Sequence, residues 1–127
     1  MSEPAIDVAA LDALEVAVGD DREFVRELVE SYLEDAPRQI DAIRAAVARG
    51  DVELVHRAAH TLKSISATIG AEALSAAARE LEALTLPADT AAEDLAEPEI
   101  AALVEVIATE FGRAGDELNA LVPRTDD

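Results

Sequence analysis

The residue types best suited to chemistry in this chain gather between residues 56 and 64. His60 is followed three residues later by Lys63, the only lysine in the sequence, and His56 precedes it by four residues. A neutral imidazole is a nucleophile and proton carrier near neutral pH, and a nearby ammonium group stabilises an anion held on the ring. This combination fits a histidine that accepts and donates a phosphoryl group, because that transfer depends mainly on positioning and charge neutralisation.

The segment from Asp51 to Ile69 has the period of an amphipathic helix. One side of that helix, which we expect to be the core side, carries Val55, Ala58, Ala59, Leu62, Ile65, Ser66 and Ile69, with Val52 and Leu54 at its edges. The opposite side carries Glu53, His56, His60, Lys63, Ser64 and Ala67. We therefore expect the ring of His60 to point into solvent.

This outward face differs from the rest of the sequence in the size of its side chains and in its charge. Ser64 and Ala67, one and two turns beyond His60, are small, so no bulky neighbour there shields the ring from a macromolecule. The local positive groups are His56, Arg57, His60 and Lys63. The 127 residues as a whole include 10 Lys and Arg against 28 Asp and Glu, which gives a formal net charge of −18.

Composition excludes several classes of function. The strong acidity argues against binding nucleic acid or an anionic membrane surface. The aromatic content of 2% argues against a stacking platform for single strands. The absence of cysteine excludes disulfides, thiolate nucleophiles and cysteine-ligated metals. Hydrophobic residues still make up 50% of the chain, which favours a folded core over disorder.

No phosphate-binding loop and no targeting segment is evident. Neither GxxxxGK(S/T) nor GxGxxG occurs, so a partner would have to supply most of the machinery for phosphoryl transfer. The longest apolar runs are too short to cross a bilayer, and the N-terminus lacks the features of a signal peptide. We expect a cytoplasmic, monomeric protein whose residues 1–127 form a single helical domain with its core at about residues 6–122.

The elements that would position this face are helices throughout, because Ala, Leu and Glu dominate and apolar residues recur at steps of three and four. Asp7 is expected to cap a first helix over about Val8–Val18, and Asp20 or Asp21 to cap a second helix that ends at Arg49 and Gly50. The remaining helices are expected over about residues 52–69, 71–84 and from Pro98 onward, with residues from Pro123 frayed.

The second helix has the longest apolar stripe, which we expect to be buried: Phe24, Val25, Leu28, Val29, Tyr32, Leu33, Ala36, Ile40, Ile43 and Val47. Pro37 lies within this stripe and predicts a kink rather than an end. In the fourth helix the inward residues are expected to be Leu74, Ala77, Ala78, Leu81 and Leu84. The segment from Thr85 to Pro98 is the loosest part of the chain, with a capping box at Thr90 and Glu93 that predicts a short extra turn.

Four long amphipathic helices on short connections predict an all-α fold. We expect an antiparallel up-down four-helix bundle, with the short N-terminal helix as an accessory that covers one end.

The segment His60-Thr-Leu-Lys63-Ser64-Ile-Ser-Ala-Thr-Ile-Gly70-Ala71 resembles the signature of histidine-containing phosphotransfer (HPt) domains. That signature is a His, a Lys three residues on, a small residue four on and a Gly ten on. The resemblance extends upstream to the helix with Phe24 and Pro37 and its Gly50-Asp51 turn, and downstream through the next helix. It covers roughly Ile6 to Leu86, while the last helix matches only in character.

The resemblance implies a role for each matched residue. His60 would accept a phosphoryl group from, and donate it to, an aspartate of a response-regulator receiver domain, in two-component signal transduction. Lys63 would stabilise the phosphorylated ring, Ser64 would be the small docking position, where Gly is commoner in the family, and Gly70 would be structural. The chain would be a phosphoryl carrier without its own kinase site.

The implied partners are receiver domains, a hybrid histidine kinase, or both. His56, Arg57 and Ala67 are candidates for contacting such a partner. The partner is also expected to supply the Mg²⁺ that phosphoryl transfer needs. We expect Arg57 and Arg79 to pair with carboxylates such as Glu53, Glu80 or Glu82.

Two other functions stay open. The chain could dock a receiver-like partner without transferring phosphate. It could also hold a metal, since His56 and His60 are four residues apart on one helix face. No third ligand is evident, however, and a metal-binding bundle needs inward-facing ligands. We therefore expect no metal site and no bound cofactor.

Overall fold

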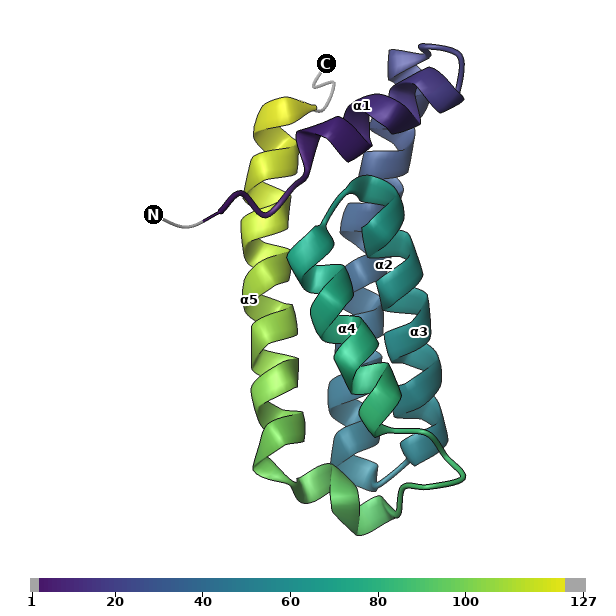
Figure 1. Cartoon of the computed structure of the whole chain (residues 1–127), viewed down its shortest axis with the longest axis vertical. Coiled ribbons are helices and arrows are strands. Elements are labelled where there is room, and N and C mark those ends of the chain that lie inside the picture. The colour runs from purple at the N-terminus through teal and green to yellow at the C-terminus, as the bar shows by residue number, and fades with distance from the viewer. Residues whose placement is uncertain (1–2, 123–127) are drawn as a thin grey trace.

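The computed structural model describes residues 3–122, and its regular elements are all helices. They are α1 (Val8–Ala17), α2 (Arg22–Arg49), α3 (Val52–Ile69), α4 (Glu72–Leu84), the short 3₁₀ helix η1 (Ala92–Ala96) and α5 (Pro98–Leu121). Figure 1 shows α2 to α5 running alternately up and down the long axis, while α1 lies across one end. The all-α, antiparallel up-down bundle predicted from the sequence is confirmed.

Aspartate caps and glycines explain most of the helix boundaries. Asp7, Asp21 and Asp51 precede α1, α2 and α3, and the carboxylate of each accepts a hydrogen bond from a backbone N–H in the first turn of its helix. Gly50 and Gly70 end α2 and α3 in the left-handed conformation. These ends lie within one or two residues of those expected from the sequence.

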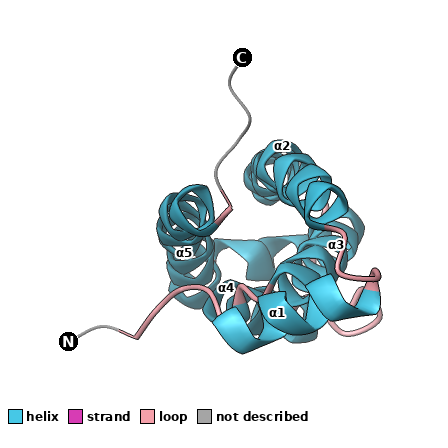
Figure 2. Cartoon of the chain, turned by 90° about the horizontal axis from the view of Figure 1, so that it is seen from above, coloured by secondary structure: helices cyan, strands magenta, loops and turns pink. Residues whose placement is uncertain are grey.

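The N-terminal segment is tied to the bundle at two points. The N–H of Asp7 donates to the carbonyl of Gly70 at 2.7 Å, and a Cβ atom on Gly70 would lie only 2.9 Å from the carbonyl oxygen of Asp7. The N–H groups of Ala5 and Ile6 each donate to the Glu117 carboxylate at 2.8 Å. These hydrogen bonds, first that of Ala5, lower the pKa of Glu117. The segment is therefore bonded both to the α3–α4 turn and to α5. Figure 2 shows it from above, running between α5 and α1.

The core lies between α2, α3, α4 and α5 and contains many small side chains. The alanines with no exposed surface are Ala36, Ala46, Ala59, Ala71, Ala78 and Ala114. Tyr32 of α2 and Ser66 of α3 share a buried hydrogen bond of 2.9 Å between their hydroxyls. Burial raises the pKa of Tyr32 to about 12. Within residues 3–122, no helix combines the length and the apolar character that crossing a membrane requires.

Some apolar residues expected in the core are exposed. Phe24 and Leu84 retain 42% and 40% of their surface. Each lies in the first or last turn of its helix, where the packed part of the bundle ends. The prediction of their burial was therefore wrong, because the helical period identifies a face and not the length over which that face has a neighbour.

The connection after α4 is built differently from the prediction. The extra turn forms as η1, but the expected capping box of Thr90 and Glu93 is wrong. The carboxylate of Asp94 accepts from the N–H of Ala91 at 2.8 Å, and the hydroxyl of Thr90 donates to the carbonyl of Leu84. Pro37 lies inside an uninterrupted α2, as expected. The fraying predicted from Pro123 onward lies outside the described residues.

Replacing Gly112 and Gly70 by alanine should change the stability of the protein in opposite directions. Gly112 lies inside α5, and a Cβ atom there would meet nothing within 4 Å. Gly112→Ala should therefore raise the free energy of unfolding by about 0.5–1 kcal/mol. Gly70→Ala should lower it, because Gly70 has a φ of +89° and its added Cβ would crowd Asp7. Urea denaturation of both variants measures the two changes, and stabilisation by Gly70→Ala would contradict the close contact.

Candidate functional site

The outward face of α3 is held by its two neighbouring helices. The hydroxyl of Ser75 on α4 donates to the backbone carbonyl of Lys63 at 2.9 Å, and the buried hydrogen bond between Tyr32 and Ser66 anchors the same turn to α2. His60 lies on the opposite side of this turn, and its side chain is 59% exposed. The expectation that its ring points into solvent is confirmed by this exposure.

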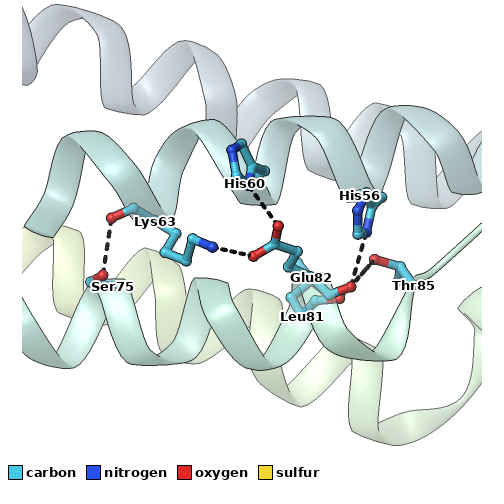
Figure 3. A network of polar contacts seen from close by, with 7 residues as sticks. All are labelled: His56, His60, Lys63, Ser75, Leu81, Glu82 and Thr85. Carbon is cyan, nitrogen blue, oxygen red and sulfur yellow. Dashed lines mark hydrogen bonds and ion pairs between the residues drawn. The ribbon is translucent and has the colours of Figure 1, made fainter.

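Glu82 of α4 brings His60 and Lys63 together, as Figure 3 shows. One carboxylate oxygen, Oε2, lies 2.6 Å from Nδ1 of His60, and the other, Oε1, lies 2.7 Å from Nζ of Lys63. The side chain of Glu82 is only 16% exposed. Its pKa is lowered mainly by the hydrogen bond from Lys63, with a smaller contribution from His60. The carboxylate is therefore ionised near neutral pH and can only accept hydrogen bonds.

This contact determines which nitrogen of His60 is free. Because an ionised carboxylate has no proton to donate, Nδ1 of His60 must carry the hydrogen. In the neutral ring the lone pair then lies on Nε2. The arrangement resembles the general case in which a carboxylate fixes the tautomer and orientation of a reactive imidazole and stabilises its positive form. His60 thus presents a nucleophilic nitrogen beside an ammonium group.

His56 has a definite structural partner. Its ring is half-buried, and Nδ1 lies 2.9 Å from the backbone carbonyl oxygen of Glu82. The hydroxyl of Thr85 donates to the carbonyl of Leu81 at 2.7 Å, next to the same end of α4. The sequence placed His56 on the outward face of α3, and the structure shows in addition that the end of α4 packs against its ring.

The remaining predicted residues lie around His60 on the surface. Ser64 and Ala67 are exposed. Arg57 pairs with Glu53 at 3.3 Å, one of the pairings expected from the sequence. An open hollow beside His60 is lined by Glu53, His56, Arg57, His60 and Pro87. Pro87, from the connection after α4, forms a wall of the hollow that the sequence did not predict.

The described part of the chain offers no metal-binding cluster. Among residues 3–122, no group of three or more His, Cys, Asp or Glu side chains is arranged to hold an ion. His56 and His60 therefore lack a third ligand within that range, and their Nδ1 atoms bond to Glu82 instead.

Glu82 is the functional candidate that sequence reasoning missed, since it was expected to pair with arginine. A signal for it exists in the pattern of α4. Ser75 and Glu82 are seven residues apart, which places them two turns apart on one face of α4. Both side chains reach α3. A carboxylate and a hydroxyl at the edge of an apolar stripe indicate a polar contact with the next helix.

Known proteins match both the sequence and the fold. The sequence model of the Hpt domain matches residues 27–121. Histidine-containing phosphotransfer protein B (HptB) from Pseudomonas aeruginosa PAO1 is 23% identical with a TM-score of 0.79, and the match covers 98% of this chain and 100% of HptB. The HPT domain from the Hpt sensor hybrid histidine kinase from Shewanella is 21% identical with a TM-score of 0.67, covering 90% of this chain and 95% of that domain. No curated protein is significantly similar to the chain in sequence.

The lowered pKa of Glu82 predicts a pH-dependent contribution to stability. A carboxyl whose pKa is lower in the folded state stabilises the fold above its unfolded value, ordinarily 4.5, and loses that contribution as pH falls through the folded pKa. Glu82→Gln should therefore be less stable than the parent near neutral pH, and the difference should shrink in acid. Thermal unfolding between neutral and acidic pH measures this. The exposed Glu80 gives the control Glu80→Gln, and a difference independent of pH would contradict the assignment to Glu82.

Proposed function

The chain belongs to the Hpt domain family, and we propose that His60 is the residue through which it performs the phosphotransfer of that family. The function of the chain is histidine phosphotransfer in a phosphorelay of two-component signalling. The observation that carries the assignment to His60 is its contact with Glu82. The contact of 2.6 Å to a carboxylate supports a hydrogen on Nδ1, and we propose Nε2 of this exposed ring as the nucleophile.

The proposed reaction is an exchange between aspartate and histidine. Nε2 of His60 attacks the phosphorus of an aspartyl phosphate on the partner, so that a P–N bond forms as the P–O bond to the aspartate breaks. The ring becomes an imidazolium that keeps its hydrogen on Nδ1, and the Glu82 carboxylate stabilises this positive charge. Donation to a receiver reverses these steps. No proton has to leave the ring in either direction.

Lys63 is the proposed stabiliser of the phosphoryl group. Its ammonium group and Nδ1 of His60 contact the two oxygens of one carboxylate, so the cation lies beside the ring that receives the phosphoryl group. Transfer spreads negative charge over the equatorial oxygens, and a cation held close to them lowers the barrier. Glu82 thus supports both the nucleophile and the cation.

His60 is favoured over His56 as the phosphoryl acceptor, because its ring is more exposed and its hydrogen-bond acceptor is charged. The His60 ring is exposed and donates to a carboxylate, while the His56 ring is half-buried and donates to an uncharged carbonyl. A carboxylate supports the positive ring that phosphorylation creates more strongly than a carbonyl does. Lys63 also contacts the carboxylate that binds His60.

The proposed partners are receiver domains of response regulators, a hybrid histidine kinase, or both. Ser64 and Ala67 leave the ring of His60 open on one side, and His56 and Arg57 line the hollow on the other. We propose that these residues contact the partner, with the positive groups complementing an acidic receiver site. A monomeric state and a cytoplasmic location remain part of this proposal.

The members of the Hpt family are phosphoryl carriers rather than kinases. We extend this to the chain as a carrier without its own catalytic metal, with Mg²⁺ supplied by the receiver. A Mg²⁺ site needs converging oxygen ligands, and the ammonium group of Lys63 repels a cation near His60.

Replacing the proposed acceptor should abolish phosphorylation and spare the fold. His60→Gln should show no acid-labile phosphate after incubation with a phosphorylated receiver, while its free energy of unfolding changes by less than about 0.5 kcal/mol, because the ring is exposed. Radiolabelling and urea denaturation measure the two quantities. Labelling retained in this variant would move the acceptor to His56. Receiver binding without any labelling of the parent chain would favour a docking function without transfer.

A bulky residue beside His60 should block the receiver and not the chemistry. Ser64→Leu should reduce transfer from a phosphorylated receiver by at least about a hundredfold, because small misplacements cost large factors in rate. Labelling by a small phosphodonor such as phosphoramidate should persist. Ser64→Ala serves as the control and should transfer normally. Undiminished transfer to the leucine variant would disprove the steric role of Ser64.

Phosphotransfer should require Mg²⁺, although the isolated chain should not bind it at the site. An NMR titration of the chain alone should show no saturable shift confined to His56, His60 and Lys63, while chelation of Mg²⁺ should stop transfer from the receiver. Saturable shifts at those residues at sub-millimolar Mg²⁺ would show that the chain has a metal site of its own.

A further inference from the structure

The end of α4 that carries Glu82 lacks the usual means of ending a helix. The last carbonyl groups of any helix have no partner within it. At the ends of α2 and α3, a left-handed glycine supplies backbone N–H groups to these carbonyls. At the end of α4 the next residue is Thr85, with a φ of −122°, and no basic residue lies in the last turn. The carbonyls near Glu82 therefore depend on other donors.

His56 is a donor to this helix end from another element. Its Nδ1 lies 2.9 Å from the carbonyl oxygen of Glu82, while the N–H and hydroxyl of Thr85 lie farther from that oxygen, at 3.3 and 3.4 Å. A carbonyl can only accept, so Nδ1 of His56 carries the hydrogen. An imidazole that donates to the last carbonyls of a helix is a recognised way of stabilising a C-terminus.

Both histidines of α3 therefore bind the same residue of α4. His56 holds the backbone of Glu82, and His60, one turn further along α3, contacts its carboxylate, as Figure 3 shows. The spacing of four residues places the two rings on one face of α3. Fixing the Glu82 backbone restricts where its carboxylate can lie, and that position determines which nitrogen of His60 carries the hydrogen.

We propose that His56 is a positioning residue, which holds the last turn of α4 so that the Glu82 carboxylate meets Nδ1 of His60. This proposal rests on the proposed function of His60. Without the His56 contact, the donors that the described structure leaves to the Glu82 carbonyl are the N–H and hydroxyl of Thr85, at 3.3 and 3.4 Å. The Thr90 hydroxyl donates to the carbonyl of Leu84 and does not reach that of Glu82. The turn then frays, and the share of His60 rings with a free Nε2 falls. His56 itself need not touch the phosphoryl group.

A matched pair of substitutions isolates the hydrogen bond. In His56→Asn the amide nitrogen lies at the same number of bonds from the backbone as Nδ1 of histidine, so the donor is kept. His56→Leu has a similar size to the asparagine variant and no donor. Both are made in the full chain, and His56→Ala replaces the leucine variant if that protein does not fold.

The primary measurement is the protonation of the His60 ring, by two-bond ¹H–¹⁵N correlation in mildly alkaline buffer, which favours neutral imidazole. The parent and His56→Asn should show the hydrogen mainly on Nδ1, and His56→Leu should show a mixture of both tautomers. Labelling by phosphoramidate should slow about tenfold or more in His56→Leu and recover in His56→Asn, because displaced groups cost large factors in rate. A purely structural role would lower the melting temperature of the leucine variant without changing the tautomer.

An unchanged His60 tautomer in a folded leucine or alanine variant would overturn the positioning role. Failure of His56→Asn to restore the tautomer would also count against it, because the donor would be present without effect. Neither outcome bears on the acceptor itself, since that assignment is tested by the labelling of the parent chain and of His60→Gln. The two proposals are thus tested separately.

Discussion

The burial of one face of α3 is the constraint on which the rest of the structure depends. Val55, Ala59 and Leu62 have no exposed surface, so α3 cannot rotate about its axis without bringing apolar groups into water. Because α3 packs between α2 and α4, its outward face is fixed as firmly as its inward face. The direction of His60 is therefore set by side chains on the opposite side of the helix. The hydrogen bonds that the Tyr32 and Ser75 side chains form with α3 add to this restraint.

Charged contacts add a second restraint on the orientation of the site. The chain has a net charge of −18, yet the outward face of α3 around His60 carries Arg57 and the single lysine, Lys63. Glu82 neutralises part of this local charge and orders His60 and Lys63 around one carboxylate. A surface ion pair in isolation adds little to stability. Here the Glu82–Lys63 pair is partly buried and Glu82 also contacts the ring of His60, so its main consequence is the orientation of the site.

Much of the fold and of the site could be predicted from the sequence. The features of the site that could not be predicted have a common physical cause. Asp7, Asp21 and Gly50 identified helix ends because caps act within a single turn. The helical period likewise predicted the exposure of His60. The contact of Glu82 with His60 and Lys63 was missed because it depends on the axial position and rotation of α4 relative to α3. Local sequence patterns do not determine these two quantities. The exposure of Leu84, two residues further on, has the same origin, since the bundle ends there.

The alanines of the core bear on how the signal passes through the molecule. Alanine has no side-chain rotamers, so helices that meet through residues such as Ala36, Ala59 and Ala114 approach closely and have few alternative packings. The message passed from one partner to the next is then the covalent group itself. The bundle then serves to hold that group at one place on its surface, where the surrounding side chains can vary to suit new partners.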